Sequence, residues 1–184
     1  MSALALTLHE GRDRLGLKGP RAPEWLVAHG IVLPMVPNTW AHSHETPGSD
    51  ALLVARLGTG EFFLEDGPAG TALKGLSPAL DEQPRGVYPV LREDWAFHLG
   101  GERVHDVLAQ VCNVNFAGLP LDSRPLIMTL MIGVAVLVVP QSAAGEQGGR
   151  HYRIWCDPTF GPYVGESLGA VVVECGGRYT GASE

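Results

Sequence analysis

Extended hydrophobic runs predict β-strands in both halves of the chain. In the first half, a short apolar strand is expected at 15–17, and the runs at 51–56 and 61–65 flank a Gly-Thr-Gly turn, which predicts a β-hairpin. In the second half, extended segments are expected at 88–91, 94–99, 126–131, 134–139 and 152–156. Strands are therefore expected to supply much of the core.

Helical spacing of apolar residues appears in three segments, at 21–29, 102–112 and 168–175. In the third segment, the valine triplet at 171–173 would equally suit a strand. A helix is favoured there because the glycine pair at 176–177 is a typical helix end. The chain is therefore expected to combine strands with three helices.

The order β-α-β-β occurs twice in this pattern, which predicts an α+β fold of duplicated β-α-β-β units. An open sheet with helices on one side follows from that order. The expected organisation is an N-terminal arm at 1–14, a first unit at 15–65, a connector at 66–86 with one weak helical turn, a second unit at 87–177 that ends in a helix, and a tail at 178–184.

Composition and charge exclude several classes of function. Apolar residues make up 45% of the chain, which is enough for a sizeable core, and 13 basic against 20 acidic residues give a net charge of −7. Such a chain repels phosphate overall, so we expect no nucleic-acid binding and no binding to an anionic membrane surface. The most apolar run, at 126–139, is too short to span a bilayer as a helix.

The N-terminal segment and the cysteines point to the cytoplasm. Residues 1–20 carry scattered charges and lack the apolar run of a signal peptide. Cys112, Cys156 and Cys175 are too few and too scattered for a disulfide framework, so we expect them to be reduced and buried.

Two motifs could carry catalysis, and each lacks the partners that it needs. Residues 165–169 match the G-x-S-x-G pattern around a nucleophilic Ser167, but no Asp or His follows that serine as an α/β-hydrolase requires. His42, His44 and Glu45 could ligate a metal, but no second His or Cys cluster with ligand spacing supports a zinc site. We therefore interpret them as a chance match and a solvated loop.

Trp40 lies among loop-forming residues, where a large side chain is difficult to bury locally. An exposed tryptophan near a rim is a frequent contributor to protein interfaces. We expect Trp40, His42 and His44 to belong to a partner interface, with packing of Trp40 in the core as the alternative. No catalytic, cofactor-binding or metal-binding residue is predicted.

Several segments resemble a known family over about residues 15–175. The segments 15–26 and 53–66 resemble the first half of the γ subunit of heterotetrameric sarcosine oxidase. The segments that resemble its second half are 97–108, 128–130, 134–138 and 152–155, together with the terminal helix. The small subunit of N-methylglutamate dehydrogenase complexes is similar, and the two families cannot be separated at this point.

The resemblance implies a fold, an activity and partners. The family's fold is related to the folate-binding aminomethyltransferase (T-protein) of glycine cleavage. Its complexes oxidatively remove an N-methyl group from a small secondary amino acid and pass the carbon to tetrahydrofolate. FAD, FMN, NAD and tetrahydrofolate are implied in the larger α and β subunits, and zinc in a separate small subunit. The γ subunit is implied to carry no cofactor and to be a non-catalytic part of an oxidoreductase.

The residues agree with such a non-catalytic role. T-protein uses an Asp shortly after a helix of this kind, and the matching position after the second helix is Asn115. An amide cannot exchange a proton near neutral pH as a carboxylate can. Two alternatives stay open: a free-standing folate-binding protein, and a small enzyme that uses Ser167 or the pair His42 and His44.

Overall fold

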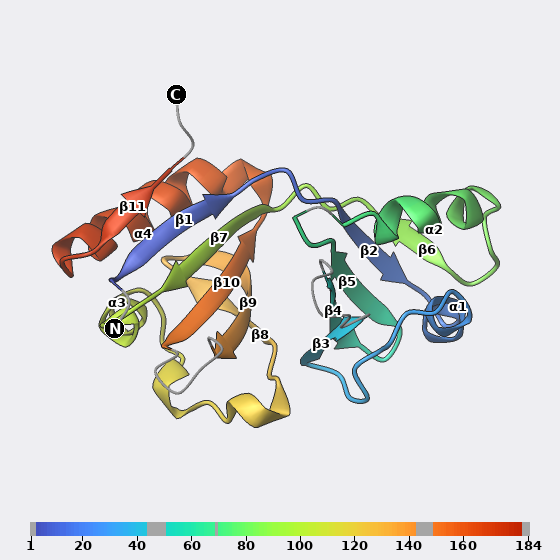
Figure 1. Cartoon of the computed structure of the whole chain (residues 1–184), viewed down its shortest axis with the longest axis horizontal. Coiled ribbons are helices and arrows are strands. Elements are labelled where there is room, and N and C mark those ends of the chain that lie inside the picture. Colours follow the sequence, from blue (N-terminus) through green and yellow to red (C-terminus); the bar gives the residue numbers. More distant parts are fainter. Residues whose placement is uncertain (1–2, 44–50, 69, 143–148, 182–184) are drawn as a thin grey trace. The chain divides into compact units, whose positions relative to one another are not determined.

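The computed structural model of the chain contains two compact units (Figure 1). It describes residues 3–43, 51–68, 70–142 and 149–181. Unit 1 comprises Met1–Glu10 and Asp94–Glu184, and unit 2 comprises Gly11–Glu93. The chain therefore begins in unit 1, forms unit 2 and then returns to complete unit 1. Each unit combines one β-sheet with α-helices, so the fold is mixed α+β as predicted.

Unit 2 is built on a five-stranded antiparallel sheet in the order β3-β4-β5-β2-β6. Its elements in chain order are β2 (Arg14–Lys18), α1 (Ala22–Ala28), β3 (Thr39–Ser43), β4 (Leu52–Gly58), β5 (Glu61–Glu65), α2 (Ala72–Asp81) and β6 (Tyr88–Val90). Leu26 of α1 and Leu73 and Leu76 of α2 join one hydrophobic core with the strand residues Phe62 and Leu64. Both helices therefore bury their apolar faces against this sheet.

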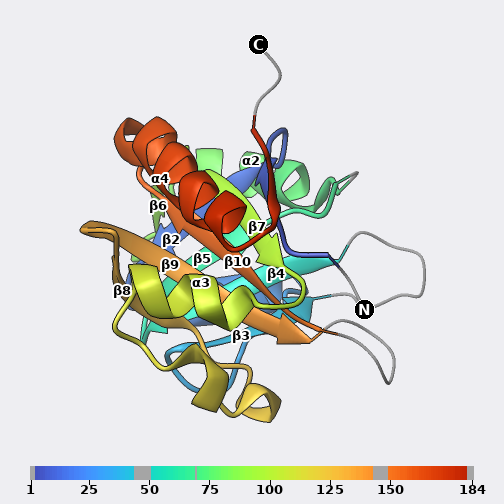
Figure 2. The ribbon, with the colours of Figure 1, turned by 90° about the vertical axis from the view of Figure 1, so that its left-hand side faces the viewer.

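Unit 1 is built on a six-stranded sheet in the order β11-β1-β7-β10-β9-β8. Its strands and α-helices are β1 (Ala5–His9), β7 (Trp95–Gly100), α3 (Val104–Val111), β8 (Ile127–Met131), β9 (Val134–Ser142), β10 (Arg150–Cys156), α4 (Gly161–Glu174) and β11 (Arg178–Thr180). Three short 3-10 helices lie at Phe116–Gly118, Leu121–Ser123 and Pro158–Phe160. Figure 2 shows α3 and α4 over one face of this sheet, where both join its hydrophobic core.

Helix α3 has the amphipathic pattern that the sequence predicts, because Val104, Val107, Leu108 and Val111 are all buried. The helix begins after Gly101, whose φ of +105° suits glycine, and a Cβ atom there would lie 2.3 Å from the backbone oxygen of Ala3. Glycine is therefore required at the turn that leads into α3.

Most predicted strands and helices are confirmed, but four segments were misread. The expected arm contains β1, whose buried Leu6 pairs with Leu99 of β7. The expected loop around Trp40 contains β3, the expected connector contains α2, and the expected tail contains β11. Leu73 and Leu76 stabilise α2 by burial despite the helix-weakening Gly75 and Pro78 within it. No helix in the described part of the chain is long and apolar enough to cross a membrane.

The two units have the same order of strands and α-helices, β-α-β-β-β-α-β, once β1 is set aside. Their sheets also agree: β3-β4-β5-β2 in unit 2 has the same connectivity as β8-β9-β10-β7 in unit 1. In unit 1, β1 pairs with β7 where β6 pairs with β2 in unit 2. Three strands follow the first helix of each unit, one more than the predicted β-α-β-β order contains.

Candidate functional site

Two of the three predicted interface residues, Trp40 and His42, lie within the described part of the chain. Trp40 and His42 lie on β3, with their ring centroids 5.2 Å apart in an edge-to-face arrangement. Trp40 is only 8% exposed, so its indole is packed in the way that the alternative prediction expected. His44 and Glu45 lie outside the described residues, and the interface and metal predictions that include them stay predictions. Among the described residues, no group of three His, Cys, Asp or Glu side chains could hold a metal ion.

Ser167 lies on α4, and the glycines of its motif serve packing. A Cβ atom at Gly165 would lie 2.6 Å from the Tyr179 hydroxyl, and one at Gly169 would lie 2.6 Å from a Tyr179 ring carbon. These two glycines share one helix face, which lets β11 place Tyr179 directly against the helix. The G-x-S-x-G pattern is therefore a helix–strand contact in this fold, and a nucleophile elbow between strand and helix is not formed.

The Asn115 side chain is hydrogen-bonded within the fold, and the three cysteines are buried in it. The Asn115 side chain accepts a hydrogen bond from the Gly118 amide at 3.3 Å, which caps a 3-10 turn. Cys112, Cys156 and Cys175 are free and buried, as expected. Burial, together with the nearby carboxylates of Asp94 and Asp157, raises the pKa of the Cys156 thiol to about 11. That thiol is therefore protonated near neutral pH and is a poor nucleophile.

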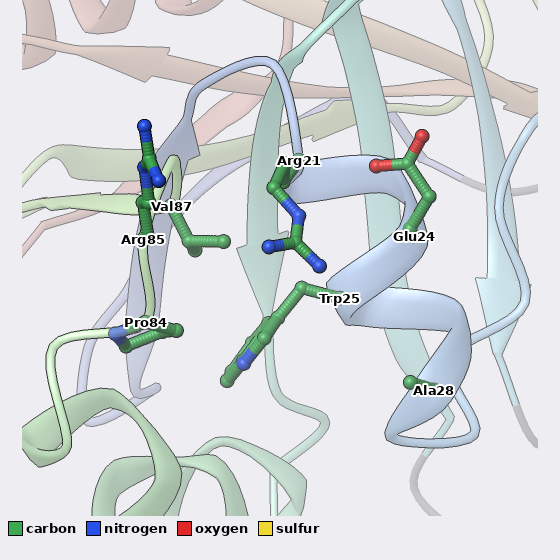
Figure 3. A pocket seen from close by; sticks show the side chains of 7 residues that line it. All are labelled: Arg21, Glu24, Trp25, Ala28, Pro84, Arg85 and Val87. Carbon is green, nitrogen blue, oxygen red and sulfur yellow. The ribbon is translucent and has the colours of Figure 1, made fainter.

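A groove beside α1 in unit 2 is the candidate ligand site among the described residues. It is a cavity of about 270 Å³ lined by Arg21, Glu24, Trp25, Ala28, Pro84, Arg85 and Val87, and we call it the α1 groove. In Figure 3, Arg21 stands just before α1 and Trp25 projects from it, while Pro84, Arg85 and Val87 form the facing wall. The Arg21 amide donates a hydrogen bond to the Gly86 carbonyl at 3.0 Å, which fixes this wall next to the start of the helix.

The Trp25 indole supplies an apolar surface in the groove. The ring centroid of His29 lies 4.1 Å from that of Trp25, and a His29 ring nitrogen is hydrogen-bonded to the Trp25 carbonyl oxygen at 2.8 Å. This local contact supports the indole from its own helix. Pro84 and Val87 extend the apolar lining on the facing wall. The groove can therefore accept a flat apolar group.

The two guanidinium groups of the groove have no hydrogen-bond or ion-pair partner among the described residues. They belong to Arg21 and Arg85, and Glu24 pairs with neither. Figure 3 shows the Arg21 guanidinium near the Trp25 side chain and the Glu24 carboxylate pointing away from the indole ring. The groove thus presents cationic donors next to an aromatic surface in a chain whose net charge is −7.

The corresponding arginine of unit 1 is bonded within the chain. Arg103 precedes α3 as Arg21 precedes α1, and each has an acidic residue three positions later. The Arg103 guanidinium donates to the Asp106 carboxylate and to the Cys175 carbonyl, both at 2.8 Å. Local sequence patterns do not reveal the α1 groove, because its two walls lie about 60 positions apart in the chain. The Arg-x-x-acid spacing at both helices is the one signal that points to it.

A larger cavity in unit 2 has most of its charged side chains engaged within the chain. This cavity of about 590 Å³ is lined by residues that include Lys18, Arg56 and Glu61. Lys18 pairs with Glu61 at 3.1 Å, and the Arg56 guanidinium donates to backbone carbonyls that include those of Pro34, Met35 and Thr59. The cationic side chains of this cavity are therefore already bonded, whereas those of the α1 groove are not.

Comparison with known proteins identifies the fold. No protein-family model matches the chain, and no curated protein matches it. Among solved structures, the glycine cleavage system aminomethyltransferase T from Bartonella henselae is similar, with a TM-score of 0.67 and 17% identity over 97% of this chain and 48% of that one. The chain therefore spans about half the length of that aminomethyltransferase.

A second similar structure is a chain of the heterotetrameric sarcosine oxidase from Corynebacterium sp. U-96, solved in complex with pyrrole 2-carboxylate. Its TM-score is 0.67, with 23% identity over 92% of this chain and 83% of that one. At these identities the similarity establishes the fold alone. The chain has a T-protein-like fold, as the sequence resemblance predicts.

Proposed function

We propose that this chain is the γ-type, non-catalytic subunit of a flavin-dependent heterotetrameric sarcosine oxidase or of a related N-methyl amino acid dehydrogenase. Such a complex would act in the cytoplasm, demethylate a small secondary amino acid oxidatively and pass the one-carbon unit to tetrahydrofolate. The observation that carries the proposal is the match with the oxidase chain, which covers most of both chains. The two chains are therefore similar in length as well as in fold.

The local structures of the candidate catalytic residues support a role outside the chemistry. The glycines around Ser167 are used to pack α4 on Tyr179, and the Asn115 side chain caps a turn. The cofactors of the proposed complex, FAD, FMN, NAD, tetrahydrofolate and zinc, would be held by α- and β-type subunits and by a small zinc-binding subunit. This chain would contribute surfaces to that assembly. The sequence suggests Trp40, His42 and His44 as the interface, and because the Trp40 indole is packed within the chain, His42 and His44 would make the contacts.

The matching element order of the two units supports a duplicated origin. We infer that the repeated unit is β-α-β-β-β-α-β, which is longer than the β-α-β-β unit that the sequence suggested. A duplicated unit would explain why Arg21 and Arg103 occupy the same place before their helices.

Purification under native conditions tests the proposed function. We expect an affinity-tagged chain, expressed in its own host, to co-purify in fixed stoichiometry with larger subunits that carry flavin absorbance. Native mass spectrometry of that fraction should show the chain inside a hetero-oligomer, and the fraction should oxidise sarcosine or another N-methyl amino acid. A chain that is recovered alone, with no flavoprotein, would contradict the proposal.

The match with the aminomethyltransferase over 97% of this chain favours a second candidate, a free-standing folate-binding protein. Calorimetric titration of the isolated chain with tetrahydrofolate distinguishes the two. Saturable micromolar binding would support the folate-binding candidate, whereas the γ-type proposal predicts no saturable binding.

A further inference from the structure

We propose that the α1 groove binds an oxyanion, a carboxylate or a phosphate, that is carried on a small flat apolar body. This site goes beyond the proposed function and does not depend on it, because every residue that lines the groove belongs to unit 2 of this chain. Four observations support the proposal: the donors, the aromatic surface, the size of the cavity and the matching position in unit 1.

The donors define the charge of the ligand. A guanidinium offers a planar set of N–H groups that matches the two oxygens of a carboxylate or a phosphate. In Figure 3 the Arg21 guanidinium lies near the Trp25 side chain, and it has no hydrogen-bond partner in the described chain. Arg85 on the facing wall is exposed and likewise without a partner there, so its side chain is free to turn toward a bound anion. Arg21 is thus the principal donor and Arg85 the secondary one.

The aromatic surface and the cavity size define the body of the ligand. Trp25, Pro84, Val87 and Ala28 give the groove an apolar lining, against which a planar ring can stack. A cavity of about 270 Å³ lies at the small end of ligand pockets, which commonly measure about 300–1,000 Å³. It is large enough for one ring with an acidic group and too small for a dinucleotide.

The matching position in unit 1 shows what an arginine before this helix binds. Arg103 donates to one carboxylate, on Asp106, and to one carbonyl oxygen, on Cys175. The oxygens that satisfy Arg103 come from its own helix and from the end of α4. In unit 2, Glu24 does not pair with Arg21, and the facing segment places Arg85 and Pro84 at the groove. An external oxyanion would supply the missing acceptor.

The overall charge of the chain makes this binding selective. With a net charge of −7, the protein does not attract anions by its general field. Any affinity for a small anion must therefore come from the local arginines and from contact with the indole. A ligand that lacks either the acid or the flat body should bind much more weakly.

Isothermal titration calorimetry of the full chain with four probes tests the proposal. Phenylacetate and phenyl phosphate combine an acid with a ring, phenylacetamide has the ring without the charge, and acetate has the charge without the ring. We expect saturable one-site binding of at least one of the two ring acids, and affinities at least about tenfold weaker for phenylacetamide and acetate. The tighter ring acid assigns the oxyanion as carboxylate or phosphate.

Variants locate the site. Arg21→Gln should weaken binding of the preferred ring acid by about tenfold or more, and Arg85→Gln by a smaller factor. Arg178→Gln removes the same charge from an exposed position of unit 1 and should leave the affinity unchanged. Both arginines of the groove are exposed, so neither change should alter the melting temperature, which serves as the control for folding.

Three results would overturn the proposal. They are an absence of saturation by both ring acids, equal binding of phenylacetamide, and binding that Arg21→Gln leaves unchanged. Because these experiments use the isolated chain and no flavoprotein, their failure leaves the proposed subunit function standing. Failure of co-purification would likewise leave the groove standing.

Discussion

Arg21 and Arg103 stand at the same place in the two units, yet only the Arg103 guanidinium makes hydrogen bonds within the described chain. Arg103 joins α3 to the end of α4 through the Cys175 carbonyl, and Gln110 adds a contact of 3.4 Å to the Cys175 sulfur. Arg21 has no such contact and borders the α1 groove. The same local sequence, an arginine before a helix with an acid three positions later, thus produces a helix–helix junction in unit 1 and an open site in unit 2.

The same topology thus gives internal packing in unit 1 and an open groove in unit 2. The carbonyl oxygen of Cys175, at the end of the 14-residue α4, accepts a hydrogen bond from Arg103. The 10-residue α2 is instead followed by the segment that carries Pro84 and Arg85. Unit 1 therefore uses its second helix for internal packing. Unit 2 has two cationic side chains left for a ligand.

The largest expected effect concerns the packing of the second helix in each unit. Gly169→Ala in α4 would place a Cβ atom 2.6 Å from the Tyr179 ring, whereas a Cβ atom at Gly75 in α2 would meet nothing within 4 Å. We expect Gly169→Ala to lower the free energy of unfolding by about 1–3 kcal/mol because the core would be overpacked. Gly75→Ala should raise it by about 0.5–1 kcal/mol through helix propensity. Urea unfolding measures both, and equal effects would contradict the contrast between α4 and α2.

A second expected effect is an acid sensitivity of unit 1. Burial and the nearby Arg150 lower the pKa of His105, an effect that Asp106 partly offsets, and burial lowers the pKa of His151. Since both folded pKa values lie below the ordinary value of 6.5, the stability contributed by the neutral rings is present above that pH and is lost as the pH falls below it. Hydrogen exchange measured at pH 7 and pH 5 should show a loss of protection in α3 and β10.

The control for this pH effect lies in unit 2. Burial raises the pKa of the Asp66 carboxyl above 3.8, so the protonated form is favoured in the folded state and unit 2 gains stability as the pH falls toward 4. His105→Gln retains a polar partner for the Tyr152 hydroxyl, which lies 2.7 Å from a ring nitrogen of His105, and should reduce the acid sensitivity of unit 1. Protection that declines first in unit 2, or an unchanged profile in His105→Gln, would contradict this account.

The smallest expected effect concerns the two arginines themselves. Arg103→Ala should lower the melting temperature slightly, because the link from α3 to the Cys175 carbonyl is lost. Arg21→Ala should leave it unchanged, because no bond within the described chain is removed. Differential scanning calorimetry of the two variants measures this contrast, and a larger loss in Arg21→Ala would show that Arg21 is structurally engaged.

Strong periodic patterns allowed much of the fold to be predicted from the sequence. The apolar spacing at 102–112 identified α3, and the Gly-Thr-Gly turn identified the hairpin of β4 and β5. β1 and β11 were missed because such short strands gain their burial only through pairing with strands distant in the sequence. α2 was missed because Gly75 and Pro78 conceal the helical spacing of Leu73, Leu76 and Leu80.

The candidate site was less predictable than the fold. Trp25 was assigned to a helix correctly, but the segment that completes the groove lies about 60 residues later and reaches α1 through the pairing of β6 with β2. Trp40 was expected in a loop because Pro34 and Pro37 precede it, yet it occupies a strand. Long-range strand pairing, which local patterns do not encode, decided both outcomes.

The most direct test of the central contrast is an NMR titration of the full chain with the preferred ring acid, in which the side-chain Nε–Hε signals of Arg21 and Arg103 are followed together. The account predicts that the Arg21 signal and the Trp25 indole signal shift with one common saturation curve, while the Arg103 signal stays in place. A titration in which both arginines shift alike, or in which neither responds, would contradict it.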